Sequence, residues 1–216
     1  MRPLTDEMPK PLLMAGGKPL VVWQLEALIR AGFREIAINT SVHRAHWVRT
    51  IGDGSGYGAS ITWLHEGDEP LGTLGGILNA LQAFAADEEP TPIVTTSGDV
   101  FTDFDYGELY PHLAAIEQGE TDAHFVLADN PPFHTMGDFG IANGRATMAP
   151  PCFNYSGIVC WSRHMFRDIP PDASALFPWA SRFVEAGRVT ATHHRGCWEN
   201  VGTPQQLADL NRRLTA

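Results

Sequence analysis

The chain has 216 residues, 44% of them hydrophobic and 10% aromatic, and it carries a formal net charge of −10. This length and composition fit one globular domain over 1–216 rather than a disordered chain. The negative charge argues against nucleic acid and anionic membranes as partners, and no window holds the ~18 uninterrupted apolar residues of a membrane span.

Helices and strands alternate in the predicted first half of the chain. Residues 2–13 include three prolines, which disfavour a helix there. Periodicity and turn signals then predict helices at 20–31, 43–51 and 106–118 and strands at 35–39, 60–64 and 92–96. A glycine-rich loop at 69–76 is expected to enter a further helix that runs to about Ala86. This alternation predicts an α/β fold, Rossmann-like, with a mainly parallel sheet flanked by helices.

The second half has a different pattern. Strands are predicted at 124–128, 139–142 and 153–159 without a helix between the last two, followed by a helix at 174–186 and strands at 189–193 and 197–200. Pro204 opens a final helix at a first-turn position that tolerates proline. We therefore expect a smaller mixed or antiparallel lobe beside the parallel sheet.

The stretch Ile93–Asp103 is the first candidate for chemistry. It has a β-branched run, typical of a buried strand, followed by a turn of small residues that presents Asp99. In open α/β sheets, ligands collect beyond the carboxyl ends of such strands. Asp99 is a candidate ligand for a divalent metal over a phosphate; the alternative is an aspartate that shapes the turn.

Lys10, between Pro9 and Pro11, is the second candidate. Its stiff backbone could aim the ammonium group at a phosphate, and the alternative is an ordinary solvated lysine. Three cysteines without metal-type spacing indicate thiols in a reducing compartment. The start of the chain lacks the apolar segment of a signal peptide, so we expect a cytoplasmic protein.

Four blocks of the sequence resemble the sugar-1-phosphate nucleotidyltransferases, and the resemblance extends from Met1 to about Leu214. These blocks are Arg2–Leu13, Leu71–Gly76, Ser97–Asp105 and Trp198–Pro204. Within that family, 129–131 and 137–139 are similar to the uridylyltransferases of N-acetylmuramate 1-phosphate, which serve cell-wall (peptidoglycan) recycling. The mannose-1-phosphate guanylyltransferases share most of the blocks.

The resemblance implies the fold of nucleotide-diphospho-sugar transferases with a sugar-binding lobe. It also implies a reaction in which a sugar 1-phosphate attacks the α-phosphorus of a nucleoside triphosphate, which is UTP by the likeness to the uridylyltransferases, with Mg²⁺ as cofactor. Positioning and charge neutralisation dominate such a displacement. The implied site residues are Lys10 and Asp99 for catalysis, Arg2 near the phosphates, Gly72 and Thr73 under the base and ribose, Ser97 and Gly98 beside the nucleotide, Asp138 and Ser156 toward the sugar, and Asp99 and Asn200 for the metal.

Asn200 departs from the pattern of the family, since many members place a second metal-binding aspartate there. An amide oxygen can still bind Mg²⁺ but adds no negative charge. Glu199 could substitute only if the strand register differed by one residue, because that shift turns a side chain to the opposite face.

A second departure lies at the start of the chain. The family normally has a first strand and a glycine-rich loop with an arginine before the residues that match 1–5. We therefore expect that this chain is N-terminally truncated relative to the family, poorly stable and nearly inactive as given, since such a loop supplies backbone donors to the phosphates.

Two other classes of function stay open at this point, and the oligomeric state is undetermined. One is a non-catalytic protein that binds sugar nucleotides, suggested by Asn200 and the missing loop. The other is a glycosyltransferase that uses Asp103 and Asp105 as its metal pair.

Overall fold

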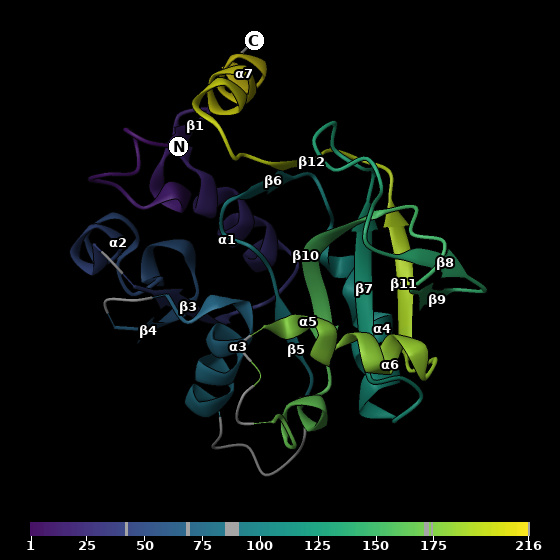
Figure 1. Ribbon diagram of the computed structural model, residues 1–216. Helices are drawn as coiled ribbons and strands as arrows, with labels where there is room; N and C mark the ends of the chain where they lie inside the picture. The colour runs from purple at the N-terminus through teal and green to yellow at the C-terminus, as the bar shows by residue number, and fades with distance from the viewer. Residues whose placement is uncertain (42, 68–69, 85–90, 171–172, 174, 216) are drawn as a thin grey trace. The chain divides into compact units, whose positions relative to one another are not determined.

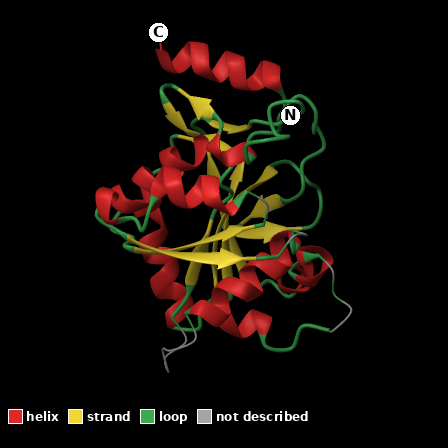
Figure 2. Ribbon diagram, turned by 90° about the vertical axis from the view of Figure 1, so that its left-hand side faces the viewer, coloured by secondary structure: helices red, strands yellow, loops and turns green. Residues whose placement is uncertain are grey.

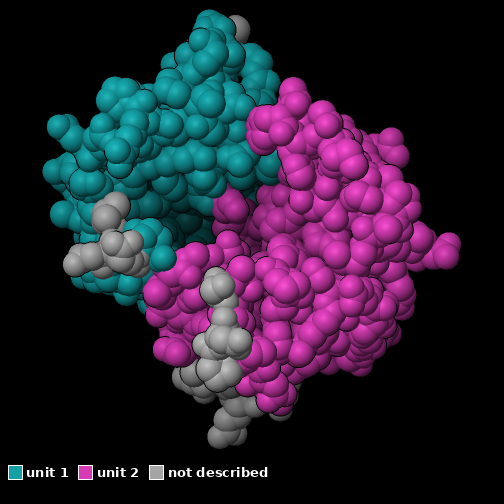
Figure 3. All heavy atoms as spheres, viewed as in Figure 1, with its two compact units in different colours: residues 1–70, 98–106, 197–216 teal, residues 71–97, 107–196 magenta. Residues whose placement is uncertain are grey.

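The computed structural model describes residues 1–41, 43–67, 70–84, 91–170, 173 and 175–215. Its contacts divide the chain into two units, shown in Figure 3. Unit 1 comprises Met1–Pro70, Gly98–Tyr106 and Cys197–Ala216, and unit 2 comprises Leu71–Ser97 and Gly107–Gly196. Each unit therefore combines segments that are far apart in the sequence. The expected single domain over 1–216 stays a prediction.

Unit 1 contains three strand pairs and three α-helices among its described residues (Figure 1). β3 and β4 pair in parallel, with α2 between them in the sequence, as expected for strands joined by a crossover helix. β1 pairs with β2, and β6 pairs with β12, both antiparallel. The elements are η1 (Lys10–Leu12), β1 (Met14–Ala15), β2 (Lys18–Pro19), α1 (Leu20–Arg30), β3 (Glu35–Thr40), α2 (Arg44–Ile51), η2 (Ser55–Tyr57), β4 (Ser60–His65), β6 (Val100–Thr102), β12 (Trp198–Asn200) and α7 (Pro204–Thr215).

Helix α1 confirms the predicted helix at 20–31 to within one residue. Its chain leaves the helix through Gly32, whose φ of +104° suits glycine at this position. The buried face of α1 belongs to a core with α2 and β4, made of Leu12, Val21, Val22, Leu25, Trp47, Ile51 and Ile61. A second cluster of Ala15, Leu20, Val201 and Leu210 packs α7 onto the start of α1 and onto β1.

Unit 2 is built on a six-stranded sheet with the order β5-β10-β7-β11-β9-β8. Helices and strands are distinguished by colour in Figure 2. The elements are α3 (Gly72–Ala83), β5 (Ile93–Thr95), α4 (Tyr110–Glu117), β7 (Ala123–Ala128), β8 (Gly140–Ala142), β9 (Arg145–Thr147), β10 (Asn154–Trp161), η4 (Arg163–Phe166), α5 (Leu176–Trp179), α6 (Ser181–Glu185) and β11 (Val189–His194). The short turn η3 (Tyr106–Leu109) spans the point where the chain passes from unit 1 to unit 2.

The α/β class with flanking helices is confirmed, but the sheet is mixed rather than mainly parallel. β7 and β11 run parallel, while β10 runs antiparallel to both β5 and β7. β9 is antiparallel to β11 and to β8. The reason is connectivity: 140–161 contains three strands without a helix, and parallel neighbours require a long crossover. The predicted mixed or antiparallel part in the second half of the chain is thus confirmed.

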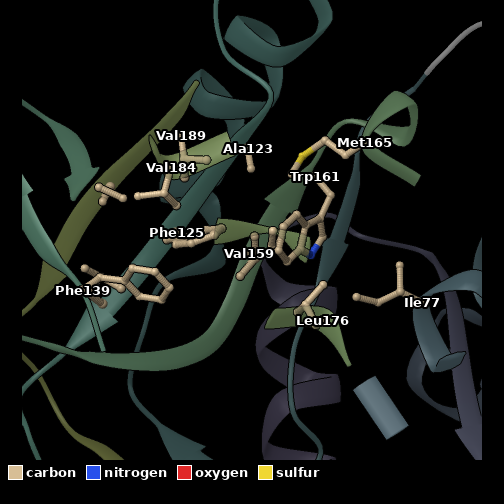
Figure 4. Close-up of a cluster of buried hydrophobic side chains, with 14 of the residues drawn as sticks. Ile77, Ala123, Phe125, Phe139, Val159, Trp161, Met165, Leu176, Val184 and Val189 are labelled. Atoms are coloured by element: carbon tan, nitrogen blue, oxygen red, sulfur yellow. The ribbon is translucent and has the colours of Figure 1, made fainter. Parts of the chain in front are cut away.

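The core of unit 2 lies on β7 and β10. All six residues of β7 are buried, as expected for a strand covered on both faces. Phe125 of β7 packs edge-to-face against Trp161 of β10, with ring centroids 5.5 Å apart. Figure 4 shows these rings with Val159, Met165 and Leu176 nearby.

Three predicted elements need correction. Two short helices, α5 and α6, replace the helix expected at 174–186, and within α5 the residue before Pro178, Phe177, has extended dihedrals (φ −102°, ψ 135°), as is common before proline. Helix α3 ends at Ala83, and the expected end at Ala86 lies outside the described residues. Strand β5, expected to be buried, is half-buried because it is at the edge of the sheet. Among the described residues, no helix has the length and apolar character needed to cross a bilayer.

Candidate functional site

Three of the predicted site residues meet in unit 1. The Lys10 ammonium lies 2.7 Å from Asp99 Oδ2 and donates to Asn200 Oδ1 at 3.1 Å. The side chains of Lys10 and Asp99 keep 22% and 35% of their surface exposed. These groups are thus partly desolvated, which strengthens their interaction while leaving one side open to solvent. The alternative of an ordinary solvated lysine is excluded for Lys10 by these two contacts.

The backbone around each residue explains why they converge. Lys10 opens the short 3₁₀ turn η1, which follows Pro9 and anchors itself in the core through Leu12. Asp99 directly precedes β6, and Asn200 ends β12 opposite Val100 of β6. Antiparallel pairing of two short strands therefore places the carboxylate and the amide next to each other.

The register of β12 also settles the alternative at Glu199. Its carboxylate pairs with Arg213 of α7 and accepts from Cys197 Sγ at 3.3 Å. Since neighbouring residues of a strand point to opposite faces, Glu199 faces away from Lys10. Burial and the nearby Glu199 carboxylate raise the pKa of the Cys197 thiol to about 11. This cysteine is therefore a neutral thiol rather than a reactive thiolate.

The Lys10–Asp99–Asn200 cluster has the chemistry of a cation site. One carboxylate and one amide oxygen converge on a single positive group, and oxygen ligands of this kind suit Mg²⁺, which normally completes its shell with waters and substrate phosphates. Within the described part of the chain, no three His, Cys, Asp or Glu side chains gather into a metal-binding group. The donor set of one carboxylate and one amide oxygen is compatible with a magnesium ion that takes its other ligands from water and phosphate, and Lys10 adds one positive charge beside it.

Ser97 and Gly98 directly precede Asp99 in the sequence. A Cβ at Gly98 would lie 3.4 Å from Val21 and 3.5 Å from Pro11, so the backbone passes closely over α1 and η1. Ser97 belongs to unit 2, where its hydroxyl would be only 2.5 Å from a Cβ at Gly157 (φ +82°). A glycine at 157 is therefore required both by conformation and by the closeness of Ser97.

Gly72 and Thr73 begin α3 in unit 2, and both are exposed. Gly72 has a φ of +70°, which a residue with a side chain rarely adopts. The predicted glycine-rich turn at a helix start is confirmed. Their contact with a base and ribose stays a prediction.

Arg2 and the two predicted sugar ligands have other partners. The Arg2 side chain is 90% exposed and lies 3.3 Å from Asp6. Asp138 accepts from the Tyr155 amide at 2.7 Å and lies 3.0 Å from His134 Nε2. These contacts anchor the loop before β8 and give Asp138 a structural role, while the sugar contact predicted for it stays a prediction.

Ser156 is 2% exposed and lies within an irregularity of the β10–β7 pairing. Its hydroxyl donates to the Val126 carbonyl at 2.5 Å and accepts from the Ile158 amide at 3.1 Å. Both hydrogen bonds involve backbone groups at the place where the regular β10–β7 pairing is interrupted, between Tyr155 and Val159. The sugar contact predicted for Ser156 stays a prediction.

Asp103 also has a backbone role. Its Oδ1 accepts from the Cys197 amide at 2.7 Å, next to a bond from Thr102 Oγ1 to the Cys197 carbonyl. These bonds join the end of β6 to the start of β12. The geometry therefore favours Asp99 over Asp103 as the functional carboxylate of the stretch Ile93–Asp103.

Two buried polar residues next to the site, Gln24 and Tyr106, were not among the residues predicted from the sequence. Gln24 Nε2 donates to the Val100 carbonyl at 2.8 Å, and the Tyr106 hydroxyl donates to Gln24 Oε1. The available signal was a glutamine within the apolar face of α1, between Val21 and Leu28. A polar side chain at such a position requires hydrogen-bond partners in the core.

Comparisons with known proteins give consistent results for the chain as a whole. Residues 1–144 match the family model described as Nucleotidyl transferase. The chain is 34% identical over 215 residues to the N-acetylmuramate alpha-1-phosphate uridylyltransferase of Neisseria meningitidis, covering 97% of this chain and 90% of that protein. It is 36% identical to a mannose-1-phosphate guanyltransferase of Debaryomyces hansenii, but over 110 residues, 50% of this chain and 30% of the other.

Solved structures show the same fold. A Bacillus anthracis protein in complex with sucrose, assigned as a glucose-1-phosphate thymidylyltransferase, superposes with a TM-score of 0.82 at 19% identity, over 100% of this chain and 90% of its own. HddC from Yersinia pseudotuberculosis complexed with GMP-PN superposes with a TM-score of 0.76 at 17% identity, over 99% and 93%. At these identities the likeness establishes the fold of nucleotide-diphospho-sugar transferases and nothing finer.

Proposed function

Because the chain belongs to the sugar-1-phosphate nucleotidyltransferase family, we propose that it transfers the uridylyl group of UTP to N-acetylmuramate 1-phosphate and releases pyrophosphate. One observation carries the choice of substrates. The Neisseria relative, whose name specifies both, matches 97% of this chain, whereas the guanyltransferases match half of it. The product, a UDP-linked cell-wall sugar, suits a role in peptidoglycan recycling in the cytoplasm.

The reaction makes and breaks one bond each at phosphorus. An oxygen of the sugar 1-phosphate attacks the α-phosphorus of UTP, and the bond to pyrophosphate breaks. The attacking and leaving groups are both anionic, so positive charge and alignment supply most of the catalysis. No side chain has to transfer a proton in this reaction. A cluster made of a lysine, an aspartate and an asparagine is therefore sufficient for it.

Each residue of the cluster then has a role in this proposal. Lys10 would bind a phosphate oxygen and stabilise the charge that builds up during transfer. Asp99 and Asn200 would hold Mg²⁺, which would neutralise the triphosphate when bound. Arg2, Gly72, Thr73, Ser97 and Gly98 are proposed to contact the nucleotide, and Asp138 and Ser156 are proposed to support the sugar pocket.

The test measures the release of pyrophosphate by the purified natural full-length protein. With MgCl₂, release is expected from UTP plus N-acetylmuramate 1-phosphate and at a much lower rate from GTP plus mannose 1-phosphate. Asp99→Asn is expected to remove the activity and serves as the control for a contaminating enzyme. Faster release from GTP and mannose 1-phosphate would overturn the choice of substrates. Binding of UDP-sugars without release from any pair would indicate a non-catalytic binding protein instead.

A further inference from the structure

A glutamine in the core of unit 1, Gln24, is hydrogen-bonded to the residue that follows Asp99. Gln24 belongs to α1 and is 2% exposed, with Val21, Leu25 and Leu28 buried around it on the same helix. Burying a carboxamide among apolar side chains is unfavourable unless its donor and acceptor are both used. In Gln24 both ends are used, by Val100 and by Tyr106.

Helix α1 contacts both sequence neighbours of Asp99, namely Gly98 and Val100. Val21 lies against Gly98, where a Cβ would come within 3.4 Å of its Cγ2. One helical turn later, Gln24 Nε2 donates to the carbonyl of Val100 at 2.8 Å. Residues three apart on a helix share one face, so a single face of α1 holds both neighbours of Asp99.

Val100 also connects Asn200, the second residue proposed to hold the metal, to the hydrogen bond from Gln24. Within the β6–β12 pair, Val100 is the residue opposite Asn200. A shift of the Val100 carbonyl therefore moves Asp99, which is the preceding residue, and also Asn200, which pairs with Val100 between the two strands. Tyr106 restrains the glutamine from its other end; its ring is fully buried and packs edge-to-face on Phe104 at 5.5 Å.

We propose that Gln24 is a positioning residue for the proposed reaction. Its carboxamide fixes the first residue of β6 and thereby sets the distances among Lys10, Asp99 and Asn200. Loosening this anchor shifts the carboxylate away from the ammonium, and a displacement of about 1 Å in such a site costs up to about 100-fold in rate. This inference rests on the proposed function for its kinetic test only; its structural test does not need activity.

The structural test uses the two lysines of the chain, Lys10 and Lys18. Lys18 pairs with Glu26 and lies over the Trp23 ring at 3.7 Å, so it is an internal reference on the same helix–strand segment. In Gln24→Met, which keeps the shape but not the hydrogen bonds, acetylation of Lys10 by an N-hydroxysuccinimide ester is expected to be about threefold faster by mass spectrometry, because less of its amine is held in an ion pair. Lys18 is expected to react at the wild-type rate.

The kinetic test separates positioning from loss of stability. Gln24→Met is expected to lower kcat about tenfold with KM for UTP changed less than about twofold. The matched control is Ile51→Ala in α2, a buried residue of the unit 1 core that lies outside the hydrogen bonds from Gln24 to Val100 and Tyr106. It is expected to lower the melting temperature and to leave kcat within about twofold below that temperature.

Two results would overturn the inference. One is an unchanged Lys10 acetylation rate in Gln24→Met; the other is an equal loss of kcat in Gln24→Met and Ile51→Ala. A wild-type protein that releases no pyrophosphate from any substrate pair would contradict the proposed function, while the acetylation result would still decide the role of Gln24.

Discussion

Lys10 has two of its donors directed at specific oxygens, and this distinguishes it from the other lysine of the chain. Its contacts with Asp99 and Asn200 bring together groups that are 89 and 190 residues away in sequence. In the proposed reaction this ammonium group would bind a phosphate that lies over the same cluster. The residue is therefore the one whose replacement should affect catalysis most directly.

Lys10→Met is expected to lower kcat/KM by about 100-fold or more, which corresponds to about 2.7 kcal/mol of transition-state stabilisation. The matched control is Lys18→Met, which removes the same charge from a position bound to Glu26 and Trp23. Its activity is expected to stay within about twofold, because the contacts of Lys18 are with Glu26 and Trp23 and not with Asp99 or Asn200. Pyrophosphate release measured over a range of UTP concentrations checks both. Equal losses in the two variants would assign the effect to net charge instead.

At the scale of elements, strand β7 carries a buried histidine whose protonation opposes folding. His124 is 1% exposed, and its ring nitrogens lie 2.9 Å from Thr190 Oγ1 and 3.1 Å from Thr192 Oγ1 of β11. The His112 ring of α4 stacks on it with centroids 3.4 Å apart. Burial, followed by repulsion from His112, lowers the pKa of His124 to about 3.

This shift predicts acid sensitivity with a definite sign. Between pH 6.5 and 3 the unfolded chain binds a proton at His124 and the folded chain does not, so the free energy of unfolding falls as pH falls. The expected loss from this group is about 2 kcal/mol between pH 6.5 and 5. Urea unfolding at several pH values checks it, with His124→Gln as the comparison. A pH slope in this range that is the same in both proteins would show that His124 does not cause it.

The elements themselves were largely predictable from local pattern. Most predicted helices and strands appear within one or two residues of the expected bounds, as in α1, β3 and β4. The prediction was wrong where a local rule was overlooked: a continuous helix was expected at 174–186, but Phe177, the residue before Pro178, has extended dihedrals. It also missed Val100–Thr102 as a strand, because three residues give no usable alternation.

At the scale of the whole molecule, each unit has a core of its own. Unit 1 has two clusters, and in one of them Leu210 of α7 packs with Ala15, Leu20 and Val201. The backbone amide of Gly16 adds a hydrogen bond to Asn211 of the same helix at 2.8 Å. The last helix thus closes the side of unit 1 that carries β1 and the segment after Asn200.

Leu210→Ala is expected to lower the free energy of unfolding by about 2–4 kcal/mol, because it leaves a cavity at a position that is 1% exposed. Leu207→Ala, at a partly buried position of the same cluster, is expected to cost less. Hydrogen exchange by mass spectrometry is expected to show the largest loss of protection in β1, α7 and the start of α1. A loss spread evenly over β7 and β10 as well would contradict separate cores.

The sequence by itself determined the α/β class, the order of most elements, the family and the residues that could carry chemistry. These follow from periodicity, turn residues and short blocks, all of which are local properties of the chain. Only the tertiary structure decided that the larger sheet is mixed, that Lys10 lies between Asp99 and Asn200, and that Gln24 lies beneath them. Strand pairing and side-chain contacts depend on which distant segments pack together, and no local pattern in a single chain records that choice.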